Sequence, residues 1–299
     1  MKNTILRSAV LGLCLTAAAL QAGAQTSPTL QKIAETGTIT LGHRESSIPF
    51  SYYDDKQQVV GYSHELMLKA VDAIKAQLKK PNLQIKLVPV TSQNRIPLVL
   101  NGTVDLECGS TTNNKERAKQ VDFSTNIFVV GTRLMTKKDS GIKDFPDLKG
   151  KNVVVTAGTT SERLLRQYNE ANKAEMRIIS AKDHGESFLT LETGRAVAFM
   201  MDDALLYGEK AKAKKADDWV VVGKPMSEEA YGCMMRKGDP EFKKVVDTAI
   251  TKAMTSGEAA KIYAKWFQQP IPPKGLNLNW PMSDDVIELF KAPNDRPFE

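Results

Sequence analysis

Residues between positions 91 and 124 carry groups that suit the binding of a small anion. The hydroxyl cluster Ser110-Thr111-Thr112 is predicted to open a helix, with Glu116 and Arg117 in its first turns. A helix start presents free backbone N–H groups and a partial positive charge, which favour a carboxylate. The Thr112 hydroxyl adds a donor, and the planar guanidinium of Arg117 can bind both oxygens of a carboxylate. The alternative for Arg117 is a surface ion pair with Glu116, which contributes little.

The elements around this cluster are predicted to alternate strand and helix, a pattern typical of parallel α/β sheets. Arg95 falls on a short apolar helix, followed by a turn at Asn101-Gly102 and a strand over residues 104–108. Other strands are predicted at residues 38–41, 83–90, 153–156, 177–180, 196–200 and 219–222. Apolar residues recur on one helical face between positions 66 and 78, and further helices are predicted to begin near Ser161, His184 and Asp203.

The length of the chain favours two lobes over one core. Without a leader, roughly 275 residues remain, too many for one small hydrophobic core. Extended segments are predicted at residues 128–136 and 230–235, and two such crossovers make a hinge about which lobes can close on a ligand. The expected division is 25–131 plus 233–299 for the first lobe and 132–232 for the second.

The N-terminal residues are typical of a secretory signal. Residues 1–24 have a charged start with Lys2 and Arg7, an apolar core, and a small-residue cleavage site that ends at Ala24. The apolar run is too short to span a bilayer. We therefore expect a signal peptide cleaved after Ala24 and a protein located in the periplasm.

Cleavage would leave two cysteines, Cys108 and Cys233, far apart in the sequence. In an oxidising compartment such an even pair favours a disulfide. Closing so long a loop would stabilise the fold by roughly 4–5 kcal/mol in the entropic treatment. Two buried free thiols are the alternative, which the sequence leaves open.

The charge of the chain does not indicate nucleic acid as a partner. The formal net charge is +6, and removing the two leader cations leaves +4. The largest basic cluster, residues 210–215, lies at the end of a predicted helix, where lysines suit the helix dipole and a solvated face. No aromatic side chains interleave with it, as a single-strand binder requires. The Pro- and Asn-rich tail beyond Pro270 is expected to run over the surface.

Three stretches together resemble the polar amino-acid-binding proteins of bacterial ABC importers, solute-binding protein family 3. The order GTVDL, STT, ER and VDFS within residues 102–124, GHRESSIPFSYYD at 42–54 and AKDHGESF at 181–188 is similar to their glutamate/aspartate-binding members. The resemblance covers nearly all of the chain after residue 25. It implies an α/β, two-lobed (Venus-flytrap) fold with two extended hinge crossovers, and binding without catalysis, cofactor or metal. It also implies L-glutamate or L-aspartate as ligand, an inner-membrane ABC permease complex as partner, and a monomer.

The same resemblance assigns roles to particular residues. Thr112 and Arg117 are expected to hold the α-carboxylate of the ligand, joined by Thr160 from the second lobe. Asp202 is expected to pair with the α-ammonium, although Asp is also a good helix N-cap. With two adjacent acids, we expect Asp202 to face the ligand and Asp203 to cap the helix.

Further donors indicate an acidic side chain on the ligand. The full set of ligand-binding residues implied by the resemblance is Arg44, Ser92, Arg95, Ser110, Thr112, Arg117, Thr160, His184 and Asp202. A neutral ligand would leave Arg44 and Arg95 uncompensated, and buried unpaired charge is costly. A second carboxylate would meet both arginines, with Ser92 and His184 completing its hydrogen bonds, whereas His184 considered alone is more often a capped or core histidine. Glutamate and aspartate differ by one methylene, worth only about 1–3 kcal/mol, so the sequence leaves that choice open.

Signatures of catalysis are absent from the sequence. There is no GxGxxG, P-loop, HExxH, CxxC or GxSxG motif, and the three histidines lack metal-ligand spacing. The alternative function is a periplasmic, dehydratase-like enzyme on the same scaffold, because some such enzymes resemble this family. It would need a general acid near a leaving group, for which Glu107 and Glu45 are the candidates. A detached sensing module of a receptor is a third hypothesis, disfavoured by the lack of a transmembrane or signalling segment.

Overall fold

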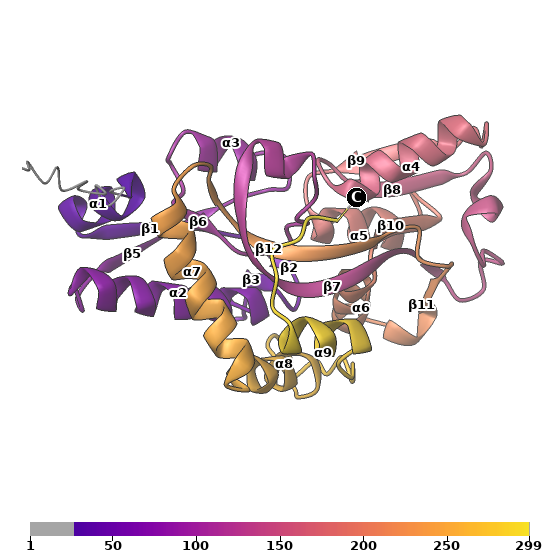
Figure 1. Ribbon diagram of the computed structural model, residues 1–299. Helices are drawn as coiled ribbons and strands as arrows, with labels where there is room; N and C mark the ends of the chain where they lie inside the picture. The colour runs from indigo at the N-terminus through magenta and orange to yellow at the C-terminus, as the bar shows by residue number, and fades with distance from the viewer. Residues whose placement is uncertain (1–26, 299) are drawn as a thin grey trace, which may run out of the picture.

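The computed structural model describes residues 27–298, so the predicted leader and its cleavage site lie outside the described residues. The described chain is a mixed α/β protein whose two lobes are joined by long strands (Figure 1). This confirms the predicted two-lobed architecture. Among residues 27–298, no helix combines the length and the hydropathy needed to cross a bilayer.

The first lobe is built on parallel strands flanked by helices. Strand β1 (Thr38–His43) lies between β5 (Gln84–Pro89) and β6 (Leu106–Glu107), and both pair with it in parallel register. Helix α2 (Tyr62–Leu78) buries much of the apolar face that was predicted for it. The remaining elements of this lobe are α1 (Pro28–Thr36), α3 (Arg95–Leu100), β2 (Ser46–Ser47), β3 (Ser51–Tyr53) and β4 (Val59–Val60).

The second lobe repeats the alternation of strands and helices, and its predicted strands and helix starts are confirmed. Strand β8 (Asn152–Thr156) lies parallel to both β9 (Arg177–Ala181) and β10 (Ala198–Asp202). The remaining elements of this lobe are α4 (Thr160–Ala171), α5 (His184–Glu192), α6 (Asp203–Lys212), β11 (Trp219–Val222) and two 3-10 helices, Phe145–Leu148 and Ala216–Asp218. Helices α4 and α5 begin at side-chain caps: Thr159 accepts from the Glu162 N–H at 3.1 Å, and Asp183 from the Glu186 N–H at 3.0 Å.

Two long strands link the lobes, as predicted. Strand β7 (Val121–Lys137) pairs antiparallel with β12 (Glu228–Arg236) along its first part and with β10 and β11 along its end. One sheet therefore runs through both lobes in the order β5-β1-β6-β12-β7-β10-β8-β9, with β11 on β7. The sheet is mixed, which corrects the expectation of parallel sheets. The reason is that the chain leaves the first lobe along β7 and returns along β12.

A disulfide joins Cys108 to Cys233, which confirms the favoured pairing. The two Cα atoms lie 4.4 Å apart although the residues are separated by 125 positions, and both side chains are buried. The bond fixes the end of β6 to β12, beside the predicted ligand-binding segment.

The predicted helix after Ser110 is wrong. Residues 111–114 are extended instead: Thr112 forms an antiparallel bridge with Tyr231, and the Asn113 N–H donates to the Ala230 carbonyl at 2.8 Å. Only a 3-10 turn, Arg117–Lys119, follows. The backbone of this segment is paired with β12 and with the C-terminal tail, so a helix is not needed to satisfy its polar groups.

The C-terminal part returns to the first lobe and to the hinge. It contains α7 (Pro240–Thr255), α8 (Glu258–Phe267) and α9 (Asp284–Lys291), none of which the sequence analysis predicted. After α9 the tail crosses β7, where the Asn126 N–H donates to the Asn294 carbonyl at 2.7 Å and the Asn126 amide donates to the Arg296 carbonyl at 2.9 Å. The last described residues therefore lie near the middle of the molecule (Figure 1).

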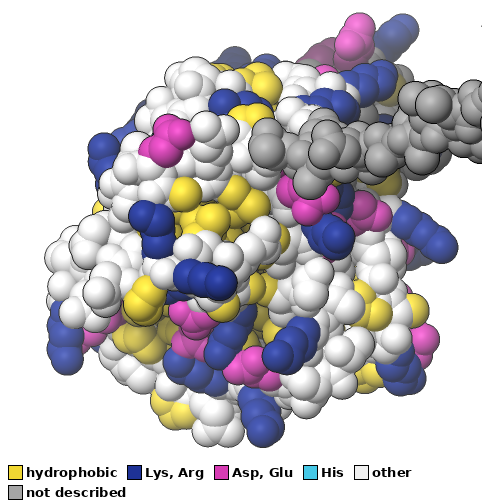
Figure 2. Space-filling model, turned by 60° about the vertical axis from the view of Figure 1, so that its left-hand side comes forward, with side chains coloured by type: hydrophobic (Ala, Val, Ile, Leu, Met, Phe, Trp, Pro, Cys, Tyr) yellow, Lys and Arg dark blue, Asp and Glu magenta, His cyan; other side chains and the backbone are white. Residues whose placement is uncertain are grey.

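Charged side chains of both signs are interspersed on the face shown in Figure 2, with no large area of one sign among the side chains it describes. The basic run at residues 210–215 begins in the last turn of α6, as predicted, where lysines favour the negative end of the helix dipole. These observations agree with a solvated surface rather than a nucleic-acid interface.

Candidate functional site

The nine residues predicted to bind a ligand converge between the two lobes. Each is buried, and none is more than 9% exposed. Those of the first lobe come from the end of β1, the start of α3 and its preceding loop, and the segment 110–117, which ends at the 3-10 turn. Those of the second lobe come from the ends of β8, β9 and β10 and the helix starts that follow, where ligands bind in open α/β sheets.

Arg44 and Arg95 lie side by side on the Ser110 segment. Arg95 donates to the Ser110 carbonyl at 3.1 Å and to the Thr111 hydroxyl at 2.6 Å, while Arg44 donates to the Ser110 hydroxyl at 3.3 Å. Burial, with the neighbouring Arg95, lowers the pKa of Arg44 to about 10. Burial also lowers the pKa of Arg95. Because arginine keeps its proton in proteins, both guanidinium groups are buried, poorly solvated cations.

Arg117 is held inward, which excludes the surface ion pair with Glu116. Its guanidinium donates to the Thr112 carbonyl at 3.1 Å and to the Gly158 carbonyl of the second lobe at 3.3 Å. Burial, followed by the charge of Arg95, lowers its pKa to about 9. Arg117 therefore contacts both lobes, and three of its five N–H groups remain for other acceptors.

The two adjacent acids at the start of α6 differ in their partners: Asp202 stands at the N-cap position, and Asp203 is the first residue of the helix. Asp202 makes no side-chain capping bond; its carboxylate accepts from the Ser161 hydroxyl at 3.4 Å and from the Tyr231 hydroxyl. Asp203 accepts from the Ala204 N–H at 2.8 Å and from the Gly131 N–H of β7 at 3.3 Å. Burial, and then the charge of Glu229, raises the pKa of Asp202 well above its usual range.

His184 opens α5 at the end of a chain of hydroxyl groups. The Ser187 hydroxyl donates to the Asp183 carbonyl at 2.8 Å, so Thr156 must donate its own proton to Ser187, also at 2.8 Å. The His184 Nδ1, 2.9 Å from the Thr156 hydroxyl, is then the donor of that pair. Burial, followed by Arg44 and Arg95, lowers the pKa of His184 well below its usual value. The ring is therefore neutral, and its Nε2 carries a lone pair.

Four buried polar atoms at one end of the site have no hydrogen-bond partner within residues 27–298. They are Ser92 Oγ, Arg95 Nε, Glu107 Oε1 and His184 Nε2. Buried polar groups are nearly always satisfied, and an unpaired one costs about 1–3 kcal/mol. A polar group of a ligand that reached these atoms would be stabilised by satisfying them.

Sequence reasoning missed Glu229, on β12. The side chain is 3% exposed, and its Oε2 accepts from the Thr112 hydroxyl at 2.5 Å and from the Thr160 hydroxyl at 2.8 Å. A pair of glutamates at the start of a strand suggests a solvated end. The usable signal was the two-residue period of strands, which places Glu229 and Tyr231 on one face.

The lobes touch each other around the site. The Ser46 hydroxyl donates to the Asp183 carboxylate and accepts from the Gly185 N–H, both at 3.3 Å. On another side, a Cβ at Gly158 would lie 2.8 Å from the Gln93 side chain, so only glycine permits this approach. The structure thus has its lobes closed together.

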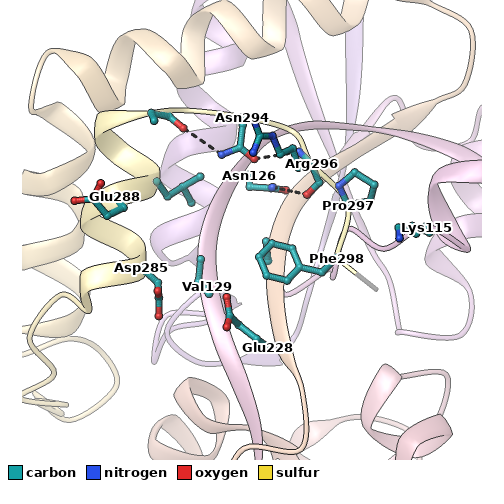
Figure 3. Close-up of a pocket in the computed structure, with 13 residues that line it drawn as sticks. Lys115, Asn126, Val129, Glu228, Asp285, Glu288, Asn294, Arg296, Pro297 and Phe298 are labelled. Carbon is teal, nitrogen blue, oxygen red and sulfur yellow. Dashed lines mark hydrogen bonds between the residues drawn. The ribbon is translucent and has the colours of Figure 1, made fainter.

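A separate cavity of about 530 Å³ lies between β7, β12, α9 and the C-terminal tail (Figure 3). Glu228, Asp285 and Phe298 line it, and none of the nine predicted residues does. A hydrogen bond from the Asn126 amide to the C-terminal tail stabilises one wall of this cavity. Among residues 27–298, no group of three or more His, Cys, Asp or Glu side chains is placed to hold a metal ion.

Comparisons with known proteins give a consistent result. Residues 39–269 match the family described as bacterial extracellular solute-binding proteins, family 3. The glutamate/aspartate import solute-binding protein of Salmonella typhimurium is 65% identical over 288 residues, covering 96% of this chain and 95% of the relative. The L-glutamate/L-aspartate-binding protein of Pseudomonas aeruginosa is 68% identical over 272 residues, covering 91% and 90%. A solved mutant of ArgBP from T. maritima has a TM-score of 0.71 at 26% identity, covering 80% of this chain and 99% of that one.

Proposed function

Because this chain belongs to family 3 of the bacterial extracellular solute-binding proteins, we propose that it captures L-glutamate and L-aspartate between its lobes for delivery to an ABC permease. The observation that carries the ligand class is the end of the site with Arg44 and Arg95, where buried donors have no partner in the part of the chain that the structure describes. Relatives above 60% identity over nearly the whole chain are named as glutamate/aspartate-binding proteins, which supports the same ligand.

The amino-acid backbone of the ligand would bind at the opposite end of the site. Arg117 and the N-terminal N–H groups of α4, which begins at Thr160, would bind the α-carboxylate, since a helix start favours an anion. Asp202 would pair with the α-ammonium. A ligand held from both sides would favour the closed arrangement by shifting an open–closed equilibrium.

The side-chain carboxylate of the ligand would bind between Arg44 and Arg95. The Ser92 hydroxyl and the Arg95 Nε–H are buried donors that this carboxylate would satisfy, and Ser110 holds the two guanidinium groups in place. Hydrogen bonds to charged groups contribute about 1.5–3 kcal/mol each, so two such bonds would separate glutamate from glutamine by more than a hundredfold.

Like its close relatives, which are named as binding proteins, the chain is a transport protein rather than an enzyme. Of the two acids considered for catalysis, Glu45 is exposed and Glu107 accepts a hydrogen bond from Thr111 at 2.7 Å. We further propose that the protein is a monomer of the periplasm, that an inner-membrane ABC permease is its partner, and that its lobes divide at 131/132 and 232/233. Those boundaries fall within β7 and β12.

Calorimetry on the mature protein tests the proposal. Glutamate and aspartate should bind with near-stoichiometric heat and without turnover, and glutamine about a hundredfold more weakly. A thermal-shift screen of the twenty amino acids provides the control, because ligands that bind the native state raise its melting temperature. A neutral or basic amino acid that stabilised the protein more than glutamate and aspartate would overturn the assignment.

A further inference from the structure

Glu229 joins two threonines that belong to different lobes. Thr112 lies on the extended segment of the first lobe, and Thr160 is the first residue of α4 in the second. Both hydroxyls reach the same carboxylate oxygen, Oε2, at 2.5 and 2.8 Å. The carboxylate thus contacts both of the threonines that the resemblance assigns to the α-carboxylate of the ligand.

The chemistry of these groups fixes the direction of the two hydrogen bonds. An ionised carboxylate can only accept, whereas a hydroxyl has a single proton to donate and two lone pairs. Each threonine therefore gives its only hydroxyl proton to Glu229. What remains on Thr112 and Thr160 toward the site is a pair of acceptor oxygens.

Other contacts hold the Glu229 carboxylate in this orientation. Its second oxygen, Oε1, accepts from the Ser227 hydroxyl at 3.0 Å. Ser227 in turn lies 2.5 Å from the Thr132 hydroxyl on β7. Hydroxyl groups from β7, from both lobes and from the residue before β12 thus surround one buried carboxylate.

We propose that Glu229 is a positioning residue that turns the Thr112 and Thr160 hydroxyls into acceptors for the α-ammonium of the ligand. This rests on the proposed function and deepens it, because it names a second determinant of amino-acid recognition beside Asp202. It also corrects the expectation that the Thr112 hydroxyl donates to the α-carboxylate. The α-carboxylate would instead be bound by Arg117 and by the backbone N–H groups of α4. The site then selects for compounds that carry an ammonium group.

The test compares glutamate with glutarate, which has both carboxylates but no ammonium. In Glu229→Ala, affinity for glutamate should fall more than about tenfold, while affinity for glutarate should hold or rise, since one buried negative charge is lost. Glu229→Gln keeps an acceptor oxygen and should retain part of the preference for glutamate. The matched control is Glu228→Gln, which removes the same charge from an exposed neighbour on the same strand (Figure 3) and should leave both affinities unchanged.

Two outcomes would overturn the proposal. Equal losses for glutamate and glutarate in Glu229→Ala would show that the residue only supports the fold, and a larger loss for glutarate would show that the threonines donate to a carboxylate. If Glu229→Ala does not fold, Thr160→Val removes one hydroxyl at constant shape and should change the ratio of the two affinities in the same direction. Wild-type binding of glutamate tests the proposed function separately. Should another amino acid bind instead, the same comparison with its deamino analogue still tests Glu229.

Discussion

The two ends of the proposed site differ in how completely the protein satisfies its own polar groups. At the backbone end, Thr112 and Thr160 bond to Glu229, and Asp202 accepts from Ser161 and Tyr231. At the side-chain end, four buried polar atoms have no partner within residues 27–298. The first end is organised by the protein before any ligand arrives and would serve any amino acid. At the second end a ligand carboxylate would satisfy the two donors, the Ser92 hydroxyl and the Arg95 Nε–H, and it would bind His184 Nε2 only after that nitrogen takes up a proton, so specificity is expected to arise there.

Charge alone does not explain this division. The sequence suggested an excess of cations, but the structure places three carboxylates, Glu107, Asp202 and Glu229, among the three arginines. The formal charges of these six groups cancel. Selection of an acidic ligand therefore depends on which donors remain unsatisfied and where they point, since buried donors are expensive to leave unpaired.

The largest expected effect comes from the disulfide that supports the backbone end. Cys108→Ser combined with Cys233→Ser should lower the free energy of unfolding by about 4–5 kcal/mol, because the bond closes a loop of more than a hundred residues. Urea denaturation of the wild-type protein with its disulfide intact and of the double variant measures the loss. Thr112 and Glu229 each lie four positions from a cysteine, so affinities for glutamate and glutamine should fall by the same factor. A loss confined to glutamate would contradict the division into two ends.

Arginine replacements at the two ends should separate acidic from neutral ligands. Arg95→Ala removes donors from the side-chain end, so affinity for glutamate should fall by about a hundredfold and affinity for glutamine much less. Arg117→Ala is the matched control, because a donor to the α-carboxylate serves both ligands and both affinities should fall equally. Calorimetry on both variants gives the dissociation constant of each variant for glutamate and for glutamine. Equal losses in Arg95→Ala would show that the side-chain assignment is wrong.

Local sequence patterns were enough to predict most of the elements and to nominate several of the candidate site residues. Apolar runs and cap residues placed the strands and helix starts of the second lobe, and so located His184 and Asp202 at the ends of strands. The two hinge segments, residues 128–136 and 230–235, were recognisable because each reads as an extended stretch at the end of a lobe. The order of residues in the family resemblance then supplied the remaining positions around the site.

What the sequence did not predict depends on partners far away in the chain. Residues 110–114 look like a helix start, but their backbone pairs with Tyr231 and with Phe298, more than a hundred positions later. Glu228 and Glu229 are identical in type and adjacent; the period of a strand places them on opposite faces, but which face is buried depends on how the sheet packs. Long-range pairing overrides local preference in both cases.

Binding of an acidic ligand should also depend on pH through His184. In the ligand-free protein the pKa of this imidazole is well below its usual 6.5, because burial and the arginines disfavour the charged form. A carboxylate beside Nε2 would favour protonation, so the complex holds more protons, and affinity for glutamate should rise as pH falls from about 8 to 6, by at most tenfold per unit. Calorimetry in buffers with different ionisation heats should detect proton uptake with glutamate and none with glutamine.

The control for this effect is His64, another buried imidazole, whose pKa is lowered to about 4 by burial and His43. His64→Gln should leave the proton uptake unchanged, whereas His184→Gln should abolish it. The lowered pKa values of His184 and His64 also predict that the free protein loses stability as pH falls below about 6.5. The reason is that these imidazoles bind protons more readily in the unfolded chain, where their pKa is the ordinary one. Proton release on binding glutamate would contradict the protonation of His184.

The smallest expected effect tests the contact between the two closed lobes rather than either end of the proposed site. Ser46 connects the lobes through two bonds of 3.3 Å, to the Asp183 carboxylate and the Gly185 N–H, and both are long for hydrogen bonds. Ser46→Ala should therefore cost only about 0.5–1.5 kcal/mol, and the loss should be shared by glutamate, aspartate and glutamine. Stopped-flow measurements should assign it to faster dissociation, because the bonds form only after the lobes meet. A loss that differed between ligands would place Ser46 in the side-chain end instead, and the boundary between the two ends would have to include β2.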